Sequence, residues 1–111
     1  ADALGRAGDA RDAVQRSIEM VLEQVDVLVI PTVPVVAPRI DGPIDGMRLL
    51  QNTWVFNAAR VPALTVPCGT GGDGLPVGLQ LVASPYAEAR LLAAGTLVTG
   101  LVNGPGAGRR A

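Results

Sequence analysis

The chain has 111 residues, 49% of them hydrophobic, and a formal net charge of −1, so it can form a core but offers no basic surface for nucleic acid. It contains no histidine, and its nine basic residues are all arginine, which excludes the histidine and lysine bases that activate serine and cysteine nucleophiles. With one cysteine, Cys68, and no histidine, the chain can form neither an internal disulfide nor a thiolate or imidazole metal site.

Apolar residues at helical spacing predict a first helix, and the stripe consists of Val14, Ile18, Val21, Leu22 and Val25. Asp9 is expected to be the N-cap of this helix. The chain starts at Ala1 and runs almost directly into the helix. We therefore expect it to be a piece of a longer polypeptide.

A short buried strand is predicted over residues 27–30, where β-branched residues are concentrated and Pro31 ends the run. Pro31, Pro34 and Pro38 then favour an extended segment, because each ring removes a donor and restricts the preceding residue. No apolar run approaches the length of a membrane-spanning helix. We expect no membrane insertion.

After a polar turn over residues 41–46, a second helix is predicted over 47–61 from the stripe Met47, Leu50, Trp54, Ala58 and Val61. Strands are predicted over 63–68 and 77–83. The loop 69–76 between them is short enough for an antiparallel hairpin, with a longer crossing connection as the alternative.

Ser84 followed by Pro85 predicts the start of a last helix, with the serine as cap and the proline in the first turn. The resulting order is α-β-α-β-β-α, which indicates a mixed α/β domain.

Gly69, Gly71 and Gly74 fit the dinucleotide pattern G-x-G-x-x-G after a predicted strand. That pattern binds a pyrophosphate only when it opens a helix, and here it leads into a second strand. A flexible turn with positive φ at the glycines is the favoured interpretation, and nucleotide binding is a minor alternative. For Cys68, a small buried thiol is favoured over a nucleophile.

Several polar and aromatic residues are candidates for a site. Asn57 shares a predicted helical face with Leu50 and Trp54, so it is expected to point toward the core, where it either ties backbone segments together or faces a pocket. Thr32 follows a strand end, where ligands bind in α/β sheets, although a structural role is also open. Trp54 is favoured as a core residue.

Three arginines, Arg39, Arg48 and Arg60, can bind a carboxylate, but exposed surface charge is the default interpretation for each.

Three blocks of the sequence resemble the amidase signature family, in the same order and spacing. The first is Asp26-Val27-Leu28-Val29-Ile30-Pro31-Thr32-Val33-Pro34 with Ala37-Pro38. The second comprises Asn52-Thr53, Phe56-Asn57 and Pro62-Ala63-Leu64-Thr65-Val66-Pro67-Cys68-Gly69. The third, and most specific, is Asp73-Gly74-Leu75-Pro76-Val77-Gly78-Leu79-Gln80-Leu81-Val82. Together they cover roughly residues 10 to 100.

The resemblance implies an amide hydrolase or amidotransferase with a mixed sheet covered by helices. Such enzymes use a serine nucleophile, a second serine in a cis peptide and a lysine base, and none of these is found here. Ser17 and Ser84 do not lie in a glycine- and serine-rich segment. Residues 1–102 are therefore expected to form the carboxy-terminal part of an amidase domain, with 103–111 as a disordered tail.

The resemblance implies scaffold and pocket roles rather than catalysis, so no catalytic residue is assigned. Thr32, Trp54 and Asn57 are the candidates for a wall of the substrate pocket. The expected partners are the missing amino-terminal catalytic part of the same enzyme and a small amide substrate, with no cofactor and no metal. A cytoplasmic location is expected, and a homo-oligomer stays open.

The sequence departs from the family at Arg60, where the family usually has glycine two residues before the proline that matches Pro62. If the backbone there needs positive φ, Arg60 costs about 1–2 kcal/mol; otherwise the local turn differs. The complete lack of lysine and histidine keeps a second hypothesis open, in which the chain is a non-catalytic α/β binding module or a degenerate amidase-like subunit.

Overall fold

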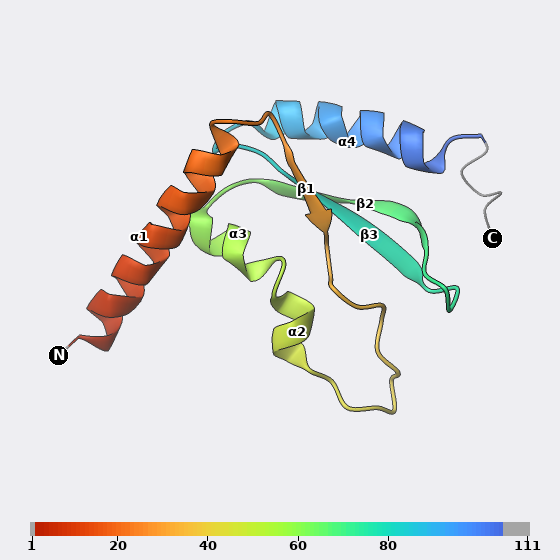
Figure 1. Ribbon diagram of the computed structural model, residues 1–111, viewed down its shortest axis with the longest axis horizontal. Helices are drawn as coiled ribbons and strands as arrows, with labels where there is room; N and C mark the ends of the chain where they lie inside the picture. Colours follow the sequence, from red (N-terminus) through yellow and green to blue (C-terminus); the bar gives the residue numbers. More distant parts are fainter. Residues whose placement is uncertain (1, 106–111) are drawn as a thin grey trace.

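The computed structural model describes residues 2–105 and contains four helices and three strands within that range (Figure 1). In chain order these are α1 (Ala3–Leu22), β1 (Leu28–Pro31), α2 (Gly46–Leu50), α3 (Trp54–Ala59), β2 (Ala63–Thr70), β3 (Pro76–Val82) and α4 (Glu88–Asn103). The predicted α/β class is confirmed. The element order also follows the prediction, except that the second helix is divided into α2 and α3.

The three strands form one sheet in the order β1-β3-β2, and both pairings are antiparallel. The hairpin predicted through residues 69–76 is therefore confirmed. Val66 lies opposite Leu79 and Leu64 opposite Leu81, while a register shift between Pro67 and Thr70 marks an irregularity near the turn. Gly69, at φ 83°, lies within this irregular stretch.

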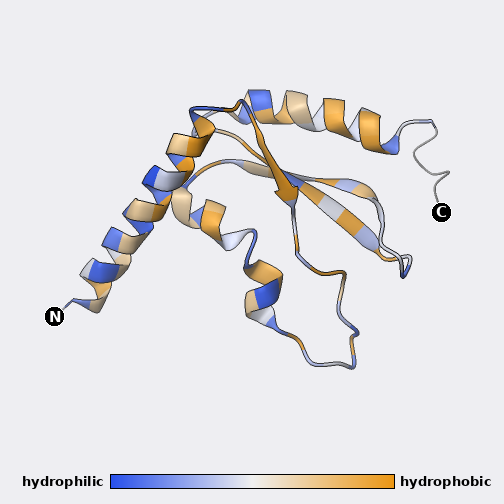
Figure 2. Ribbon diagram, in the orientation of Figure 1, coloured by the Kyte–Doolittle hydropathy of each residue, from blue (hydrophilic) through white to orange (hydrophobic). Residues whose placement is uncertain are grey.

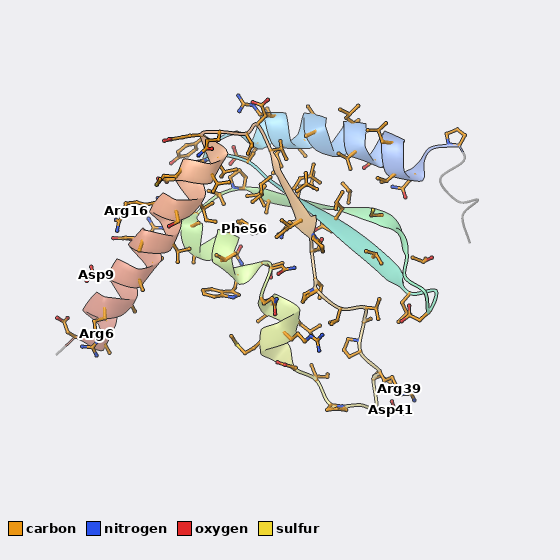
Figure 3. The ribbon with its side chains drawn as sticks, viewed as in Figure 1. Arg6, Asp9, Arg16, Arg39, Asp41 and Phe56 are labelled. Atoms are coloured by element: carbon orange, nitrogen blue, oxygen red, sulfur yellow. The ribbon has the colours of Figure 1, made fainter. Side chains whose placement is uncertain are left out.

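Helices cover both faces of the sheet (Figure 1). On one face, Leu81 and Ala83 of the central region pack with Val66 and with Leu91 of α4. On the other face, Val82 packs with a cluster from α1 and α3 and the residues after it, namely Leu22, Phe56, Ala59 and Val61. Alternate residues of β3 thus contribute to two separate cores, as the two-residue period of a strand requires. Phe56, labelled in Figure 3, belongs to the same buried cluster as Leu22 of α1 and Val82 of β3.

Each outer strand carries a proline whose carbonyl accepts a hydrogen bond from an asparagine side chain. Because the Thr32 amide donates to the Gly78 carbonyl, the pattern of an antiparallel ladder directs the Pro31 carbonyl outward, where the Asn52 side chain donates to it at 2.9 Å. On the opposite edge, the Pro67 carbonyl accepts from the Asn103 side chain at 2.8 Å. A proline has no N–H to offer another strand, and its carbonyl is occupied, so both edges are closed to further pairing at these points.

The first helix differs from its prediction at both ends. It begins at Ala3 with Asp2 as N-cap, so Asp9 lies inside the helix and is not a cap, and it ends at Leu22, before Val25. Only the later turns of α1 pack on α3 and the sheet, through Ile18 and Leu22. The residues before them are largely exposed, and their apolar spacing is too sparse to mark the helix start.

The predicted helix over 47–61 is interrupted by a turn. The Thr53 amide and hydroxyl both bond to the Leu50 carbonyl, at 2.9 and 3.1 Å, which ends α2 and reorients the chain. The face that is buried is consequently that of Phe56 and Ala59, while Leu50 and Trp54 are about half exposed, at 53% and 49%. The predicted core position of Trp54 is wrong for this reason.

The last helix begins at Glu88 rather than at Ser84. The Ala87 amide donates to the Ser84 carbonyl at 3.1 Å, and Tyr86 has φ 64°, so residues 84–87 form a turn with proline second and a left-handed residue third. At the other end, Asn103 is the last residue of α4. It is also the first residue of the predicted tail, of which residues 106–111 lie outside the described part of the chain.

Candidate functional site

The segment that leaves β1 is fixed to the sheet at Thr32. Its amide donates to the Gly78 carbonyl at 3.0 Å, and its hydroxyl lies 3.2 Å from the Thr65 hydroxyl. Since Thr65 is on β2 and Thr32 continues β1, their side chains meet across the central strand at Gly78. A Cβ atom at Gly78 would lie 2.9 Å from the Thr32 Oγ1 atom and 3.0 Å from the Thr65 Cγ2 atom. Only glycine permits this contact without displacement.

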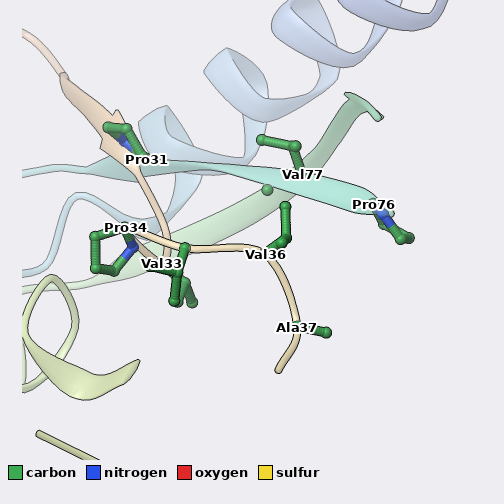
Figure 4. Close-up of a pocket in the computed structure, with 9 residues that line it drawn as sticks. Pro31, Val33, Pro34, Val36, Ala37, Pro76 and Val77 are labelled. Atoms are coloured by element: carbon green, nitrogen blue, oxygen red, sulfur yellow. The ribbon is translucent and has the colours of Figure 1, made fainter. Parts of the chain in front are cut away.

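Beyond Thr32 the chain forms one side of an apolar groove of about 440 Å³, shown in Figure 4. Its lining comes from two segments, residues 31 and 33–37 on one side and Pro76, Val77 and Gly78 on the other. None of these side chains is charged. The prolines in residues 31–38 keep the first segment extended along β3, as the sequence predicts.

A second pair of contacts anchors the turn before α3 to the sheet. The Gln80 side chain donates to the Asn52 carbonyl at 2.8 Å, and the Asn52 side chain donates to the Pro31 carbonyl. Sequence reasoning missed both residues as part of the site. Gln80 and Asn52 do occur in the family-like blocks, but nothing in periodicity or spacing indicates that a glutamine in a strand and an asparagine in a turn face each other.

The structure places the three predicted wall residues on two elements. Thr32 is half-buried beside the groove, whereas Trp54 and Asn57 are exposed on α3. The expectation that Asn57 points to the core is wrong, because the turn at residues 51–53 rotates α3 so that Phe56 and Ala59 are buried instead. Within residues 2–105 no side-chain hydrogen bond joins Thr32, Trp54 and Asn57. Asn52 links the two elements, because its side chain donates to the Pro31 carbonyl beside Thr32 and it lies two residues before the start of α3.

Arg60 occupies a left-handed conformation, with φ 57° and ψ 39°. Its amide donates to the Asn57 carbonyl, and the Val61 amide donates to the Phe56 carbonyl, the pair of bonds that closes a helix through a left-handed residue. Arg60 therefore has the positive φ that the family's glycine at this position suggested. Arg60 is exposed and lines an open cleft of about 540 Å³ with Tyr86, the other non-glycine residue with positive φ in the described range.

The other two candidate arginines are also on the surface. Arg39 forms a bidentate ion pair with Asp41, through Nε–Oδ1 at 2.9 Å and Nη2–Oδ2 at 2.8 Å, at the tip of the loop before α2 (Figure 3). The Arg39 guanidinium holds the pKa of the Asp41 carboxyl below its ordinary value, and a backbone hydrogen bond adds to this effect. Arg48 is exposed on α2, where its amide donates to the capping Asp45 side chain.

The glycine loop over residues 69–76 is a turn between two strands, as the sequence predicts. Gly69 and Gly74 have φ 83° and 80°, and the loop closes through a bond from the Gly71 amide to the Leu75 carbonyl at 2.8 Å. β3 begins at Pro76, so the helix that a dinucleotide site requires does not follow. Cys68 lies in β2 and is half-buried.

Two further observations concern the same range. Among residues 2–105, no three histidine, cysteine, aspartate or glutamate side chains gather as a metal-ion site would require. In that part of the chain no helix is both long and apolar enough to cross a bilayer.

Comparison with known proteins identifies the family. The family model described as Amidase matches residues 2–92. This chain belongs to the amidase family. The match includes the Thr32 segment, the Asn52 turn, α3 and the whole β2–β3 hairpin, so the groove and both sets of anchoring contacts are built from family sequence.

Similar proteins agree with this assignment. A glutamyl-tRNA(Gln) amidotransferase subunit from Chloroflexus aurantiacus is 45% identical over 94 residues, which are 81% of this chain and 19% of that protein. The crystal structure of the corresponding subunit from Thermotoga maritima superposes with a TM-score of 0.80 at 28% identity, over 88% of this chain and 22% of that one. A 6-aminohexanoate cyclic dimer hydrolase gives a TM-score of 0.76 at 29% identity, over 85% and 23% of the two chains.

The chain thus spans about a fifth of the length of the relatives that it matches. It corresponds to one segment of a longer family architecture.

Proposed function

We propose that this chain is part of an enzyme that cleaves carbon–nitrogen bonds in small amides, and that it supplies scaffold and one wall of the substrate cavity. The observation that carries the proposal is the family match over residues 2–92. The similar proteins are named as an amidotransferase subunit, as a 6-aminohexanoate cyclic dimer hydrolase and as a peptide amidase, and the amidotransferase and amidase names denote chemistry at an amide.

The bond-breaking groups are assigned to the remainder of the protein. Amide cleavage needs a nucleophile, a base to deprotonate it and donors for the oxyanion. This chain contains neither lysine nor histidine, and its two serines are Ser17 on α1 and Ser84 in the turn before α4. The partner in catalysis is the amino-terminal part of the same enzyme. This chain matches about a fifth of the length of its relatives, which leaves room for such a part.

The proposed wall consists of Thr32, Trp54 and Asn57. Thr32 suits this role because the sheet fixes both its amide and its hydroxyl beside the apolar groove. Trp54 and Asn57 suit it because α3 leaves an aromatic surface and an amide exposed near the anchored turn, where the rest of the enzyme can close over them. A cytoplasmic location is part of the proposal, since the free Cys68 suits a reducing compartment.

The test begins with the coding sequence upstream of Ala1. We expect it to encode a lysine followed by a glycine- and serine-rich segment, and we expect the longer protein to release ammonia or amine from simple amides. The 111-residue chain alone is expected to release none. Turnover by the purified chain alone, or an upstream sequence without that lysine and segment, would overturn the proposal.

The wall is tested in the longer protein with Thr32→Val, Trp54→Ala and Asn57→Ala. Each removes a contact worth about 1–3 kcal/mol if it faces substrate, so KM should rise roughly tenfold or more in each variant. Thr96→Val is the matched control, because Thr96 is exposed on α4 and bonds only to its own helix at Leu92. An unchanged KM in all three variants would remove the wall assignment.

A further inference from the structure

Gln80 is the buried polar side chain of the described core, with 3% of its surface exposed. It lies in the central strand between Leu79 and Leu81, and its cross-strand neighbours are Ile30 and Thr65. An amide in such a position must be paired, since an unpaired buried donor costs more than a hydrogen bond contributes. The Gln80 Nε2 atom is paired with a main-chain atom 28 residues away, the Asn52 carbonyl.

Asn52 continues the connection. Its side-chain nitrogen donates to the Pro31 carbonyl, 21 residues earlier in the chain, at 2.9 Å. Two hydrogen bonds therefore tie the central strand to the α2–α3 turn, and that turn to the end of β1. We call this set of contacts, Gln80–Asn52–Pro31, the latch.

The residues joined by the latch are adjacent to both parts of the proposed wall. Thr32 follows Pro31 directly, and α3 begins at Trp54, two residues after Asn52. The α2–α3 turn makes no strand pairing of its own. Phe56 and Ala59 pack the rest of α3 into the core, and the latch adds the hydrogen bonds that fix the turn itself beside the end of β1. An apolar side chain at position 80 would fill the same core volume but would leave the turn free to shift.

We infer that Gln80 and Asn52 are positioning residues, which fix Thr32 and the amino end of α3 relative to each other and so set the shape of the substrate cavity. This inference rests on the proposed function for its effect on catalysis. It does not require either side chain to touch substrate.

The kinetic test uses Gln80→Met and Asn52→Asp in the longer protein. Methionine keeps the length and volume but cannot donate, and aspartate keeps the shape of asparagine while losing the donor to Pro31. Both variants are expected to raise KM at least tenfold with a smaller change in kcat. Asn52→Asp keeps the inference testable if Gln80→Met fails to fold, because its change lies in a turn outside the buried core.

Two controls separate positioning from stability. Gln24→Met makes the same chemical change at an exposed glutamine whose side chain bonds back to α1, and it should leave KM unchanged. Val66→Ala removes a buried side chain that faces α4, so it should lower stability without raising KM. A KM near the wild-type value in both latch variants, or an equal rise in Val66→Ala, would overturn the inference.

An exchange measurement decides the inference independently of activity. In the same protein, breaking the latch should speed hydrogen exchange of the Thr32 amide, which bonds to Gly78, by about tenfold, while the Leu91 amide on α4 keeps its protection. If the wild-type protein shows no amidase activity, the proposed function fails but this comparison still holds. An unchanged exchange rate of the Thr32 amide in both latch variants would show that the latch does not fix Thr32.

Discussion

At the scale of single residues, Arg60 shows how a backbone requirement can outweigh side-chain preference. A left-handed residue must close α3, because the Arg60 and Val61 amides both turn back to carbonyls of that helix. Glycine meets this requirement without a steric penalty, whereas a side chain costs about 1–2 kcal/mol. The bonds persist with arginine in place, so the surrounding contacts of Phe56 and Val61 in the core compensate for the strain.

The substitution Arg60→Gly is therefore expected to raise the free energy of unfolding by about 1 kcal/mol. Urea denaturation at low protein concentration measures the change. Arg48→Gly is the matched control, because Arg48 lies within α2, where glycine lowers stability by about 1 kcal/mol. Equal or lower stability of Arg60→Gly would show that the strain is absent or that the guanidinium contributes a compensating contact.

A second residue-scale prediction concerns the Arg39–Asp41 pair. Because the pKa of Asp41 is lowered in the folded chain, mainly by Arg39, the pair adds to stability above the carboxyl's ordinary pKa. That contribution is lost as the pH falls through the lowered value. The carboxyl titration of Asp41, followed by NMR, should have its midpoint below the ordinary range in the wild type and return toward it in Arg39→Gln.

The control for this titration is Arg48→Gln. It removes an arginine that does not pair with Asp41, so it should leave the midpoint of the Asp41 titration unchanged. Both side chains of the pair are largely exposed, 81% for Arg39 and 64% for Asp41. The effect should therefore diminish with added salt. A midpoint that Arg39→Gln does not move would contradict the assignment.

At the scale of elements, the strands could be predicted from the sequence and the helix limits could not. β-Branched and leucine residues are concentrated in all three strands, and Pro31 and Pro76 mark strand ends in both the sequence and the structure. The helix signals depended on spacing alone. The stripe over 47–61 fits one helix, but the bonds of Thr53 to Leu50 break it, and Phe56 rather than Trp54 then faces α1.

In the candidate site, too, some features could be predicted from the sequence and others could not. Thr32 could be found because a threonine between two prolines past a strand end has a local signature. The Gln80–Asn52 contact could not, since it joins residues 28 positions apart whose meeting depends on where the α2–α3 turn folds. The departure at Arg60 was visible only against the family pattern, and its left-handed φ required the structure.

The packing of α4 on β2 supports a third prediction. Gly95 is buried at the contact, and a Cβ atom there would collide with the Leu64 side chain, whereas nothing lies near the corresponding position of Gly100 on the same helix. In Gly95→Ala the Leu64 side chain must shift, so this variant should be less stable than Gly100→Ala by about 1 kcal/mol or more. Gly100→Ala should raise the free energy of unfolding by up to about 1 kcal/mol, because alanine favours the helix.

Thermal unfolding followed by circular dichroism compares the two variants directly. Both make the same chemical change in the same helix, so helix propensity cancels between them. Equal effects would mean that α4 does not approach β2 at Gly95 as closely as the structure shows.

At the scale of the whole molecule, the chain is a thin slab. Its radius of gyration is 16.5 Å, and its extents are 56 × 39 × 17 Å, whereas a compact domain of this length has a radius of gyration of about 13 Å. The long loop before α2 and the first turns of α1 extend away from the sheet (Figure 1). This shape is consistent with a segment that spans about a fifth of its relatives.

The surface of α4 leads to the last prediction. Between Arg90 and Asn103 the helix carries no charged residue, Figure 2 shows hydrophobic turns along it, and Leu97 and Leu101 are 65% and 73% exposed. Exposed leucines on a helix whose polar surface residues there are only threonines favour contact with a partner, so the isolated chain should self-associate at micromolar concentration. The double variant Leu97→Gln/Leu101→Gln should shift sedimentation toward the monomer, while Thr99→Gln, also exposed on α4, should not. The occupied carbonyls of Pro31 and Pro67 on the two sheet edges make strand pairing the less favourable route of association, so the α4 surface should dominate. A wild-type chain that sediments as a monomer at these concentrations would show that this surface is tolerated in water without a partner.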